Sequence, residues 1–132
     1  MGYLLDSNAC IRALKQPGSS VGQRILAVPA TEIFLCTIVY TELYYGVYKS
    51  TQIERNLARL EVFCRPFVCL PFDLPSAKIA GQIRAQLFAK GTPIGSNNIL
   101  IGAIAVANNF TLITHNIGEF SRIDGLAYED WE

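Results

Sequence analysis

Tyr3-Leu4-Leu5-Asp6-Ser7-Asn8, or YLLDSN, opens the chain with a short apolar run that ends at an acidic side chain. The apolar residues predict a buried β-strand, because such runs lie in the interior of a sheet. Asp6 or Ser7 can then cap a helix over residues 8–14, since their side-chain oxygens accept hydrogen bonds from the first free amides of a helix. The stretch therefore predicts a strand that turns directly into a helix, with an acid at the turn.

The same order of strand and helix repeats along the rest of the chain. Such alternation predicts an α/β fold with three layers, α/β/α, in which helices cover both faces of a mainly parallel central sheet. No repeat or linker interrupts the pattern, so we expect a single domain over residues 1–132. Further strands are expected at 33–39, 68–70, 111–114 and within 126–131, and further helices at 41–48, 52–64, 76–90 and 96–107.

The composition is that of a globular protein that buries part of its surface against a partner. Apolar residues make up 51% and charged residues 17% of the 132 residues, which is more core-forming material than an ordinary soluble surface needs. No apolar run reaches the roughly 18 residues that a membrane span requires. The beginning of the chain also lacks the basic and apolar parts of a signal peptide. We therefore expect a cytoplasmic protein with no membrane segment.

Charge and cysteine content argue against two other classes of protein. The net charge is zero, so global electrostatics do not by themselves indicate a nucleic-acid binder. Residues 119–132 are acidic and the rest of the chain is mildly basic, a distribution that we expect to be solvated surface. The only histidine is His115, and no cysteine pair has the spacing of a zinc site. All four cysteines are expected to be buried free thiols: Cys10, Cys36, Cys64 and Cys69.

Polar residues follow the predicted strands at places that meet at one edge of a parallel sheet. Asp6 follows the first strand, Glu42 lies soon after the second, and His115–Glu119 follow a later one. Asn97 and Asn98 begin a helix on the same side. Ligands of parallel α/β folds bind outside the carboxyl ends of the strands. Carboxylate and amide oxygens suit Mg²⁺ or Mn²⁺, and a cation held by them can assist phosphodiester hydrolysis.

Other α/β chemistries lack their motifs in this chain. The turn after the first strand is not glycine-rich, as a dinucleotide-binding fold requires. The chain has no P-loop motif and no G-x-S-x-G nucleophile elbow. The metal-assisted interpretation is therefore preferred.

Six short motifs follow one another along the chain: YLLDSN at 3–8, TELYYG at 41–46, GQIRA at 81–85, GTPIG at 91–95, THNIGEF at 114–120 and GLAYEDW at 125–131. This ordered set resembles the PIN-domain ribonucleases and, more narrowly, the VapC-type toxins of bacterial type II toxin–antitoxin pairs. The resemblance runs essentially from end to end, and the set is more specific than any one member. It implies a Mg²⁺- or Mn²⁺-dependent endoribonuclease that cuts structured RNA (tRNA or rRNA), forms a homodimer and is neutralised by a cognate antitoxin.

The resemblance also implies which residues form the site. Asp6 and Glu42 match the first two acids of the family, and Asn116 matches the fourth polar position, with Glu119 close by. These four residues and Asn98 are the candidate metal ligands; all of them except Glu119 are also candidate catalytic residues. The third acid belongs to the pattern I-G-x-x-D, which here ends in Asn98.

Asn98 is the departure from the family that matters most. An amide keeps one oxygen ligand but removes a negative charge, at a cost of about 1–3 kcal/mol of metal-binding free energy. Metal binding roughly ten- to a hundred-fold weaker would follow, so we expect impaired cleavage. The sequence is compatible with an inactivating replacement and with a natural difference. The alternative function is a non-catalytic PIN-like module that binds an antitoxin or RNA.

Tyrosines close to Glu42 predict a surface for a partner. Tyr44, Tyr45 and Tyr48 belong to the same predicted helix. Aromatic side chains are enriched in protein–protein interfaces. We therefore expect these tyrosines to contact the antitoxin or the second subunit.

Overall fold

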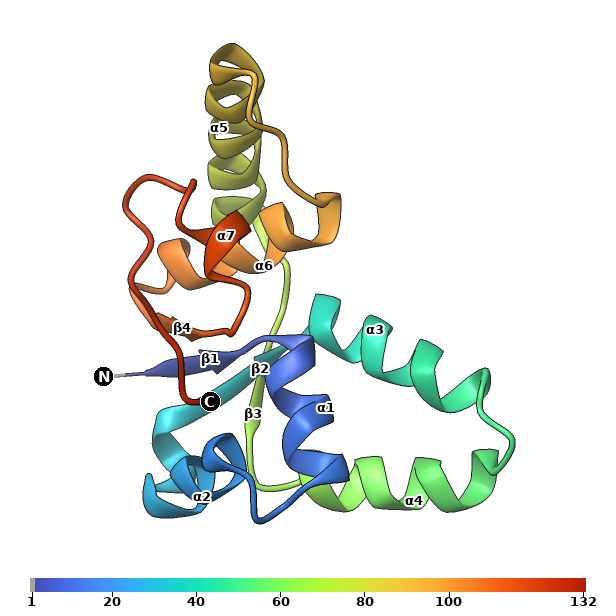
Figure 1. Ribbon diagram of the computed structural model, residues 1–132. Helices are drawn as coiled ribbons and strands as arrows, with labels where there is room; N and C mark the ends of the chain where they lie inside the picture. Colours follow the sequence, from blue (N-terminus) through green and yellow to red (C-terminus); the bar gives the residue numbers. More distant parts are fainter. Residues whose placement is uncertain (1) are drawn as a thin grey trace.

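The five strands form one sheet in which every neighbouring pair is parallel, in the order β3-β2-β1-β4-β5. The computed structural model describes residues 2–132 (Figure 1). The central strand β1 pairs with β2 on one side and with β4 on the other. The prediction of a mainly parallel sheet is confirmed. The strands are β1 Tyr3–Leu5, β2 Ile33–Cys36, β3 Val68–Leu70, β4 Thr111–Ile113 and β5 Tyr128–Glu129.

The helices divide between the two faces of the sheet. Parallel strands are joined by right-handed crossovers. The connections β1 to β2 and β2 to β3 run in one direction across the sheet, and those from β3 to β4 and β4 to β5 run back, so they cover opposite faces. One face carries α1 Ser7–Lys15, α2 Ser20–Ala27, α3 Thr37–Tyr48 and α4 Ile53–Cys64; the other carries α5 Leu74–Lys90, α6 Ser96–Ala107 and α7 Ile117–Phe120.

The reversal of direction lies between β1 and β4, at the centre of the sheet. This is the topological switch point, where open α/β sheets bind their ligands. The two arms of the molecule, α3 with α4 and α5 with α6, extend from the sheet in different directions on either side of it (Figure 1). The fold therefore places Asp6, at the end of β1, and Thr114, at the end of β4, on neighbouring strands.

The core is built from the strands and from the apolar α6. Leu4, Leu5, Leu112 and Ile113 are fully or almost fully buried, as expected for central strands that are covered on both faces. The buried residues of α6 lie around most of the helix, so its sequence is nearly all apolar and not amphipathic. No helix found among residues 2–132 has the length and apolar character to cross a membrane.

Several predicted boundaries and burial states were wrong. The strand expected at 33–39 ends at Cys36, because the apolar pattern continues into the first turn of α3 and does not mark the boundary. Helices α2 and α7 were not predicted. Cys69 is exposed, since β3 is an edge strand, while Cys10, Cys36 and Cys64 are buried as expected.

Candidate active site

Asp6 is the buried acid at the centre of the sheet edge. It is the N-cap of α1, where its Oδ1 accepts a hydrogen bond from the Ala9 amide at 2.8 Å. Its own amide donates to the Ile113 carbonyl at 3.1 Å, which ties the cap to β4. Only 4% of the residue is exposed. The backbone therefore fixes the place of Asp6 on both sides.

Burial raises the pKa of Asp6 above its ordinary value. Desolvation is the largest cause, and the nearby charge of Glu42 adds to it. Hydrogen bonds from the Thr114 hydroxyl and the Ala9 amide act in the opposite direction, but the net effect is upward. The charged form of this carboxyl is thus less stable in the folded protein than in water.

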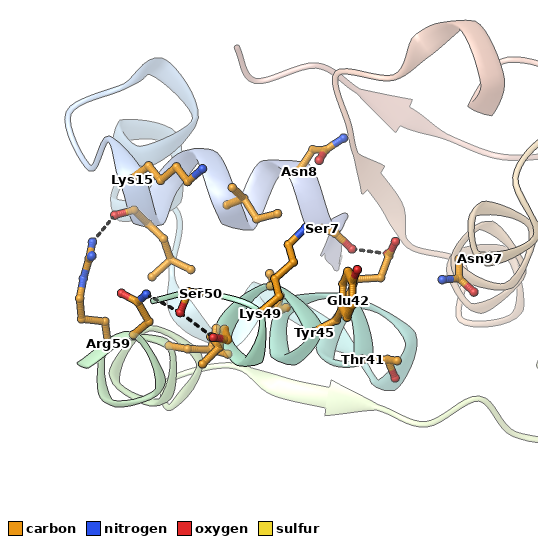
Figure 2. A pocket seen from close by; sticks show the side chains of 17 residues that line it. Ser7, Asn8, Lys15, Thr41, Glu42, Tyr45, Lys49, Ser50, Arg59 and Asn97 are labelled. Atoms are coloured by element: carbon orange, nitrogen blue, oxygen red, sulfur yellow. Dashed lines mark hydrogen bonds between the residues drawn. The ribbon is translucent and has the colours of Figure 1, made fainter. Parts of the chain in front are cut away.

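Glu42 reaches the same region from α3, and a hydroxyl of α1 holds it there. Ser7 Oγ donates to Glu42 Oε1 at 2.5 Å (Figure 2). Ser7 directly follows Asp6, and Asp6 and Glu42 are close enough for their charges to interact. The predicted convergence of these two acids is therefore seen in the structure.

The other candidate residues form a second cluster around Glu119. Asn98 Nδ2 donates to Glu119 Oε1 at 3.2 Å, and Asn116 Nδ2 donates to Glu119 Oε2 at 3.3 Å. The amide of Gly95, the N-cap of α6, also donates to Glu119 Oε1, at 2.8 Å. These hydrogen bonds, first the one from Gly95 and then the one from Asn98, lower the pKa of Glu119. Glu119 therefore stays charged over a wide pH range.

The start of α6 has no side-chain cap. Gly95 is the N-cap and Ser96 is the first helical residue. The carboxylate of Glu119 instead accepts a hydrogen bond from the backbone amide of Gly95. A negative charge near the N-terminus of a helix is favourable, so the start of α6 and the side chain of Glu119 stabilise each other.

Thr114 connects the two clusters. Its hydroxyl oxygen accepts a hydrogen bond from the Asn116 amide at 2.9 Å, and the same hydroxyl hydrogen bonds with Asp6. Thr114 is 1% exposed, so this arrangement is isolated from water. The sequence reasoning missed Thr114 and Ser7 as site residues. The signal that could have found them is a hydroxyl next to a candidate acid at a strand end.

The donor set fits a divalent cation. Three carboxylates, those of Asp6, Glu42 and Glu119, lie in the two clusters. Among the salt bridges of residues 2–132, none joins any of the three to a Lys or Arg side chain. Asp6 and Glu42 are close enough for their charges to interact. Neighbouring acids without a cationic partner favour a bound cation, and oxygen donors suit Mg²⁺ or Mn²⁺.

A groove leads away from Glu42 between α1 and the α3–α4 arm. It encloses about 840 Å³ and is lined at one end by Ser7, Glu42 and Asn97. Basic side chains line it farther along; Figure 2 labels Lys15, Lys49 and Arg59 among them. The groove thus joins an acidic end to a basic one.

The tyrosines of α3 lie on one side of that helix. Tyr44 packs against Tyr40 and Tyr48, with ring centroids 6.0 Å apart in each pair. Tyr45 lines the groove, where Lys49 Nζ lies 4.8 Å from its ring centroid. Tyr45 and Tyr48 are 65% and 58% exposed. With 3.6 residues per turn, Tyr44, Tyr45 and Tyr48 fall within about 100° of one another around the helix axis.

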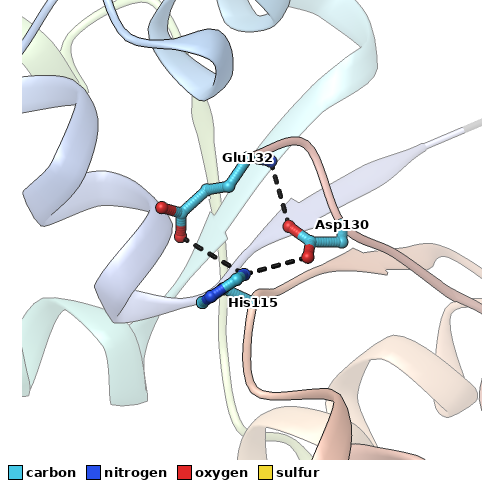
Figure 3. Close-up of side chains that lie close together, drawn as sticks. All are labelled: His115, Asp130 and Glu132. Atoms are coloured by element: carbon cyan, nitrogen blue, oxygen red, sulfur yellow. Dashed lines mark hydrogen bonds and ion pairs between the residues drawn. The ribbon is translucent and has the colours of Figure 1, made fainter.

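The acidic end of the chain folds back onto the sheet edge. Trp131 is buried and packs against Tyr3, with ring centroids 5.1 Å apart. Asp130 and Glu132 lie on either side of His115, with Asp130 Oδ2 at 2.9 Å from Nδ1 (Figure 3). The hydrogen bond that the His115 ring donates to Asp130 raises the pKa of His115. The carboxylates of Asp130 and Glu132 are exposed, as expected for the acidic tail, while Trp131 between them is buried.

Comparison with known proteins agrees with this architecture. The chain belongs to the PIN-domain family, whose model matches residues 3–126. It is 38% identical to Ribonuclease VapC2 of Rickettsia felis, over 100% of this chain and 99% of that protein. It is 36% identical to the tRNA(fMet)-specific endonuclease VapC of Salmonella typhimurium, over 98% and 97%. The resemblance to VapC-type proteins is thereby confirmed.

Solved structures give the same result for the fold. The chain matches VapBC2 from Rickettsia felis, bound to a DNA fragment from its promoter, with a TM-score of 0.94 and 36% identity over the whole of both chains. DNA-bound VapBC from Salmonella typhimurium matches with a TM-score of 0.94 and 36% identity, over 100% of this chain and 99% of that one. The three-layer PIN-like fold is therefore confirmed.

Proposed function

We propose that this chain is the toxin of a type II toxin–antitoxin pair and acts as an endoribonuclease on structured RNA, tRNA or rRNA, with Mg²⁺ or Mn²⁺. The observation that carries the proposal is the set of unpaired carboxylates at the carboxyl edge of the sheet. The relatives also support the proposal, since proteins that match this chain nearly end to end are named ribonucleases or endonucleases. We place the protein in the cytoplasm, where such RNA lies.

The metal would be held by Asp6 and Glu42, together with the oxygens of Asn98 and Asn116 and the nearby Glu119. When bound, it supplies positive charge for the phosphodiester and a water of lowered pKa. The protein residues position these ligands. The α1 cap fixes Asp6, Ser7 holds Glu42, and Thr114 orients the backbone of Asn116. The ligands are thus placed by hydrogen bonds formed before the substrate arrives.

The groove is the proposed path of the RNA. Phosphates are attracted to Lys and Arg side chains, and Lys15, Lys49 and Arg59 line the groove that begins at Glu42. Tyr45 offers an exposed ring in the same place, and such rings stack on unpaired bases. RNA affinity should therefore fall steeply as the salt concentration rises.

A cognate antitoxin is the proposed protein partner. The matched VapBC structures are complexes bound to DNA, which supports an antitoxin for this chain as well. Tyr44, Tyr45 and Tyr48 remain the proposed contacts, on the side of α3 where Tyr45 borders the groove.

Removing either acid tests the proposal. Asp6→Ala and Glu42→Ala should abolish Mg²⁺-dependent cleavage, because each removes a charged ligand from the cation. The measurement is cleavage of purified initiator tRNA and rRNA, with and without Mg²⁺ or Mn²⁺, and with EDTA as the metal-free reference. Glu54→Ala is the matched control, since Glu54 is an exposed acid at the start of α4. Cleavage that survives both site variants would contradict the proposal.

Asn98→Asp separates the nuclease from its alternative. If Asn98 impairs a working nuclease, the acid should strengthen metal binding by roughly ten- to a hundred-fold and increase cleavage. A non-catalytic module that binds an antitoxin or RNA predicts binding with no cleavage even in this variant. The alternative draws its support from the same feature, the missing charge at position 98.

A further inference from the structure

Glu119 accepts hydrogen bonds from three separate segments that meet beside the proposed metal site. The Asn98 amide group and the Gly95 backbone amide share its Oε1, at 3.2 and 2.8 Å, and the Asn116 amide group donates to its Oε2 at 3.3 Å. Both oxygens of the carboxylate are thus occupied by neutral N–H donors. The arrangement is built around a negative charge at position 119.

The hydrogen bond to Glu119 fixes which way the Asn98 amide is turned. Only Nδ2 can donate, so the opposite rotamer would bring Oδ1 against a carboxylate oxygen and would be repelled. With Nδ2 held, Oδ1 points away from Glu119. No hydrogen bond to Oδ1 is formed within residues 2–132, and this atom is not among the buried unsatisfied ones. Oδ1 is therefore accessible as a neutral oxygen ligand.

An aspartate at position 98 would not fit this pair. Its carboxylate would stand about as far from Glu119 as the present 3.2 Å contact, with no proton between the two oxygens. Two carboxylates at that separation repel each other unless a cation lies between them. Asn98 therefore suits Glu119 in the metal-free protein in a way that Asp does not.

We infer that Glu119 is the positioning residue of Asn98: it accepts hydrogen bonds from the amide groups of Asn98 and Asn116 and so fixes which way both side chains are turned. The part of this inference that concerns the metal rests on the proposed function. The pairing itself does not, because it concerns the stability of the metal-free fold.

A double-mutant cycle tests the pairing. Four proteins are compared by thermal unfolding in EDTA at one pH: the natural chain, Asn98→Asp, Glu119→Gln, and the double variant. Asn98→Asp should lower Tm when Glu119 is present. In the Glu119→Gln background the same substitution should lower Tm by less than half as much, because the introduced amide group can donate a hydrogen bond to the new carboxylate. Such non-additivity is the mark of interacting side chains. Equal costs in the two backgrounds would overturn the inference.

Metal titration tests the positioning role without relying on catalysis. Glu119→Gln should weaken Mn²⁺ binding, measured by calorimetry, by about tenfold or more, as removal of an outer-shell partner does. The double variant, which returns the charge to position 98, should recover affinity to within about threefold of the natural chain. Glu54→Gln is the control and should leave affinity unchanged. An unchanged affinity for Glu119→Gln, or no recovery in the double variant, would contradict the role.

The two proposals can fail separately. If none of the four proteins cleaves RNA while the cycle is non-additive and Mn²⁺ binding follows the pattern above, the proposed nuclease function fails and the inference stands. If the natural chain cleaves RNA and the cycle is additive, the nuclease function stands and the inference fails.

Discussion

Asp6 has two roles that have opposite effects on the stability of the fold. As the N-cap of α1 it stabilises the fold through its hydrogen bond with Ala9. As a buried acid beside Glu42 it costs stability when it is charged, which is the state that a metal ligand must have. The neutral amide of asparagine could perform the first role without this cost. Retaining an acid here is therefore explained by chemistry and not by folding.

Replacing Asp6 with Asn should stabilise the metal-free protein at neutral pH. The pKa of Asp6 is raised in the folded state, so the charged form destabilises the fold above that pKa, and stability returns as the pH falls through it. Asp6→Asn keeps the capping oxygen and removes the charge. Thermal unfolding in EDTA should show a higher Tm at pH 7 than in the natural chain.

The same comparison at lower pH provides the check on the cause. The Tm advantage of Asp6→Asn should shrink as the pH is lowered toward the folded pKa of Asp6, where the natural side chain becomes neutral. An advantage that is independent of pH would point to packing instead of charge. A lower Tm at every pH would contradict the prediction.

Single residues were predictable from the sequence only where their position alone decides their role. Asp6 and Glu42 follow strands of a parallel sheet, and this is enough to bring them together. The hydroxyls of Ser7 and Thr114 were not predictable, because the same residues are equally common as caps or as strand ends. The partners of Glu119 depend on how the chain enters α6 at Gly95, and no pattern of hydrophobicity records that entry.

At the scale of the elements, helix α5 ends because one residue, Gly91, adopts a left-handed backbone conformation. Gly91 adopts φ 68°, in the left-handed region, and its amide donates to the Leu87 and Phe88 carbonyls. This is a common way to end a helix, and only glycine adopts it without strain. The turn sets the direction in which the chain leaves α5 toward Gly95 and the start of α6. The turn at the end of α5 therefore helps to determine where Asn98 lies.

Two Gly→Ala substitutions in the same part of the fold should have opposite effects. Gly91→Ala should lower the free energy of unfolding by about 1 kcal/mol, because alanine is strained at positive φ. Gly81→Ala lies inside α5, where an added Cβ meets nothing within 4 Å, and should raise it by about 0.5–1 kcal/mol through helix propensity. Urea unfolding of both variants measures the difference. The same sign for both would contradict the assignment of Gly91.

Elements with a strong pattern were predicted well, and weak ones were not. The apolar strands and the long α5 follow from composition and spacing. The helix α2 and the single turn α7 are short, and tertiary contacts stabilise them more than propensity does. The end of β2 was placed three residues late, because Thr37, Ile38 and Val39 are β-branched although they begin a helix.

At the scale of the whole molecule, large apolar side chains remain exposed on the outer helices. Phe88 of α5 is 86% exposed and Leu26 of α2 is 83% exposed. Apolar surface of this kind is usually covered in an assembly. The exposure agrees with the high apolar content of the chain, which indicated a partner.

The homodimer stays a prediction, and Phe88 offers a way to test it. Sedimentation equilibrium should give a mass twice the 14.6 kDa of one chain. Phe88→Ser removes exposed apolar area and should weaken association if this surface is buried between the two chains. Lys78→Ser, at another position on α5, is the control. A single-chain mass at every concentration would contradict the dimer.

The pairing of β1 with β4 determines when the proposed active site can form during synthesis of the chain. The Asp6 amide is bonded to the Ile113 carbonyl, and Asn98, Asn116 and Glu119 all come from the last third of the chain. A growing chain on the ribosome holds Asp6 and Glu42 for most of its synthesis without the residues that complete the site. If the proposed nuclease function holds, the nascent chain should not cleave RNA until translation is almost finished, and an antitoxin made earlier would already be present when the site forms.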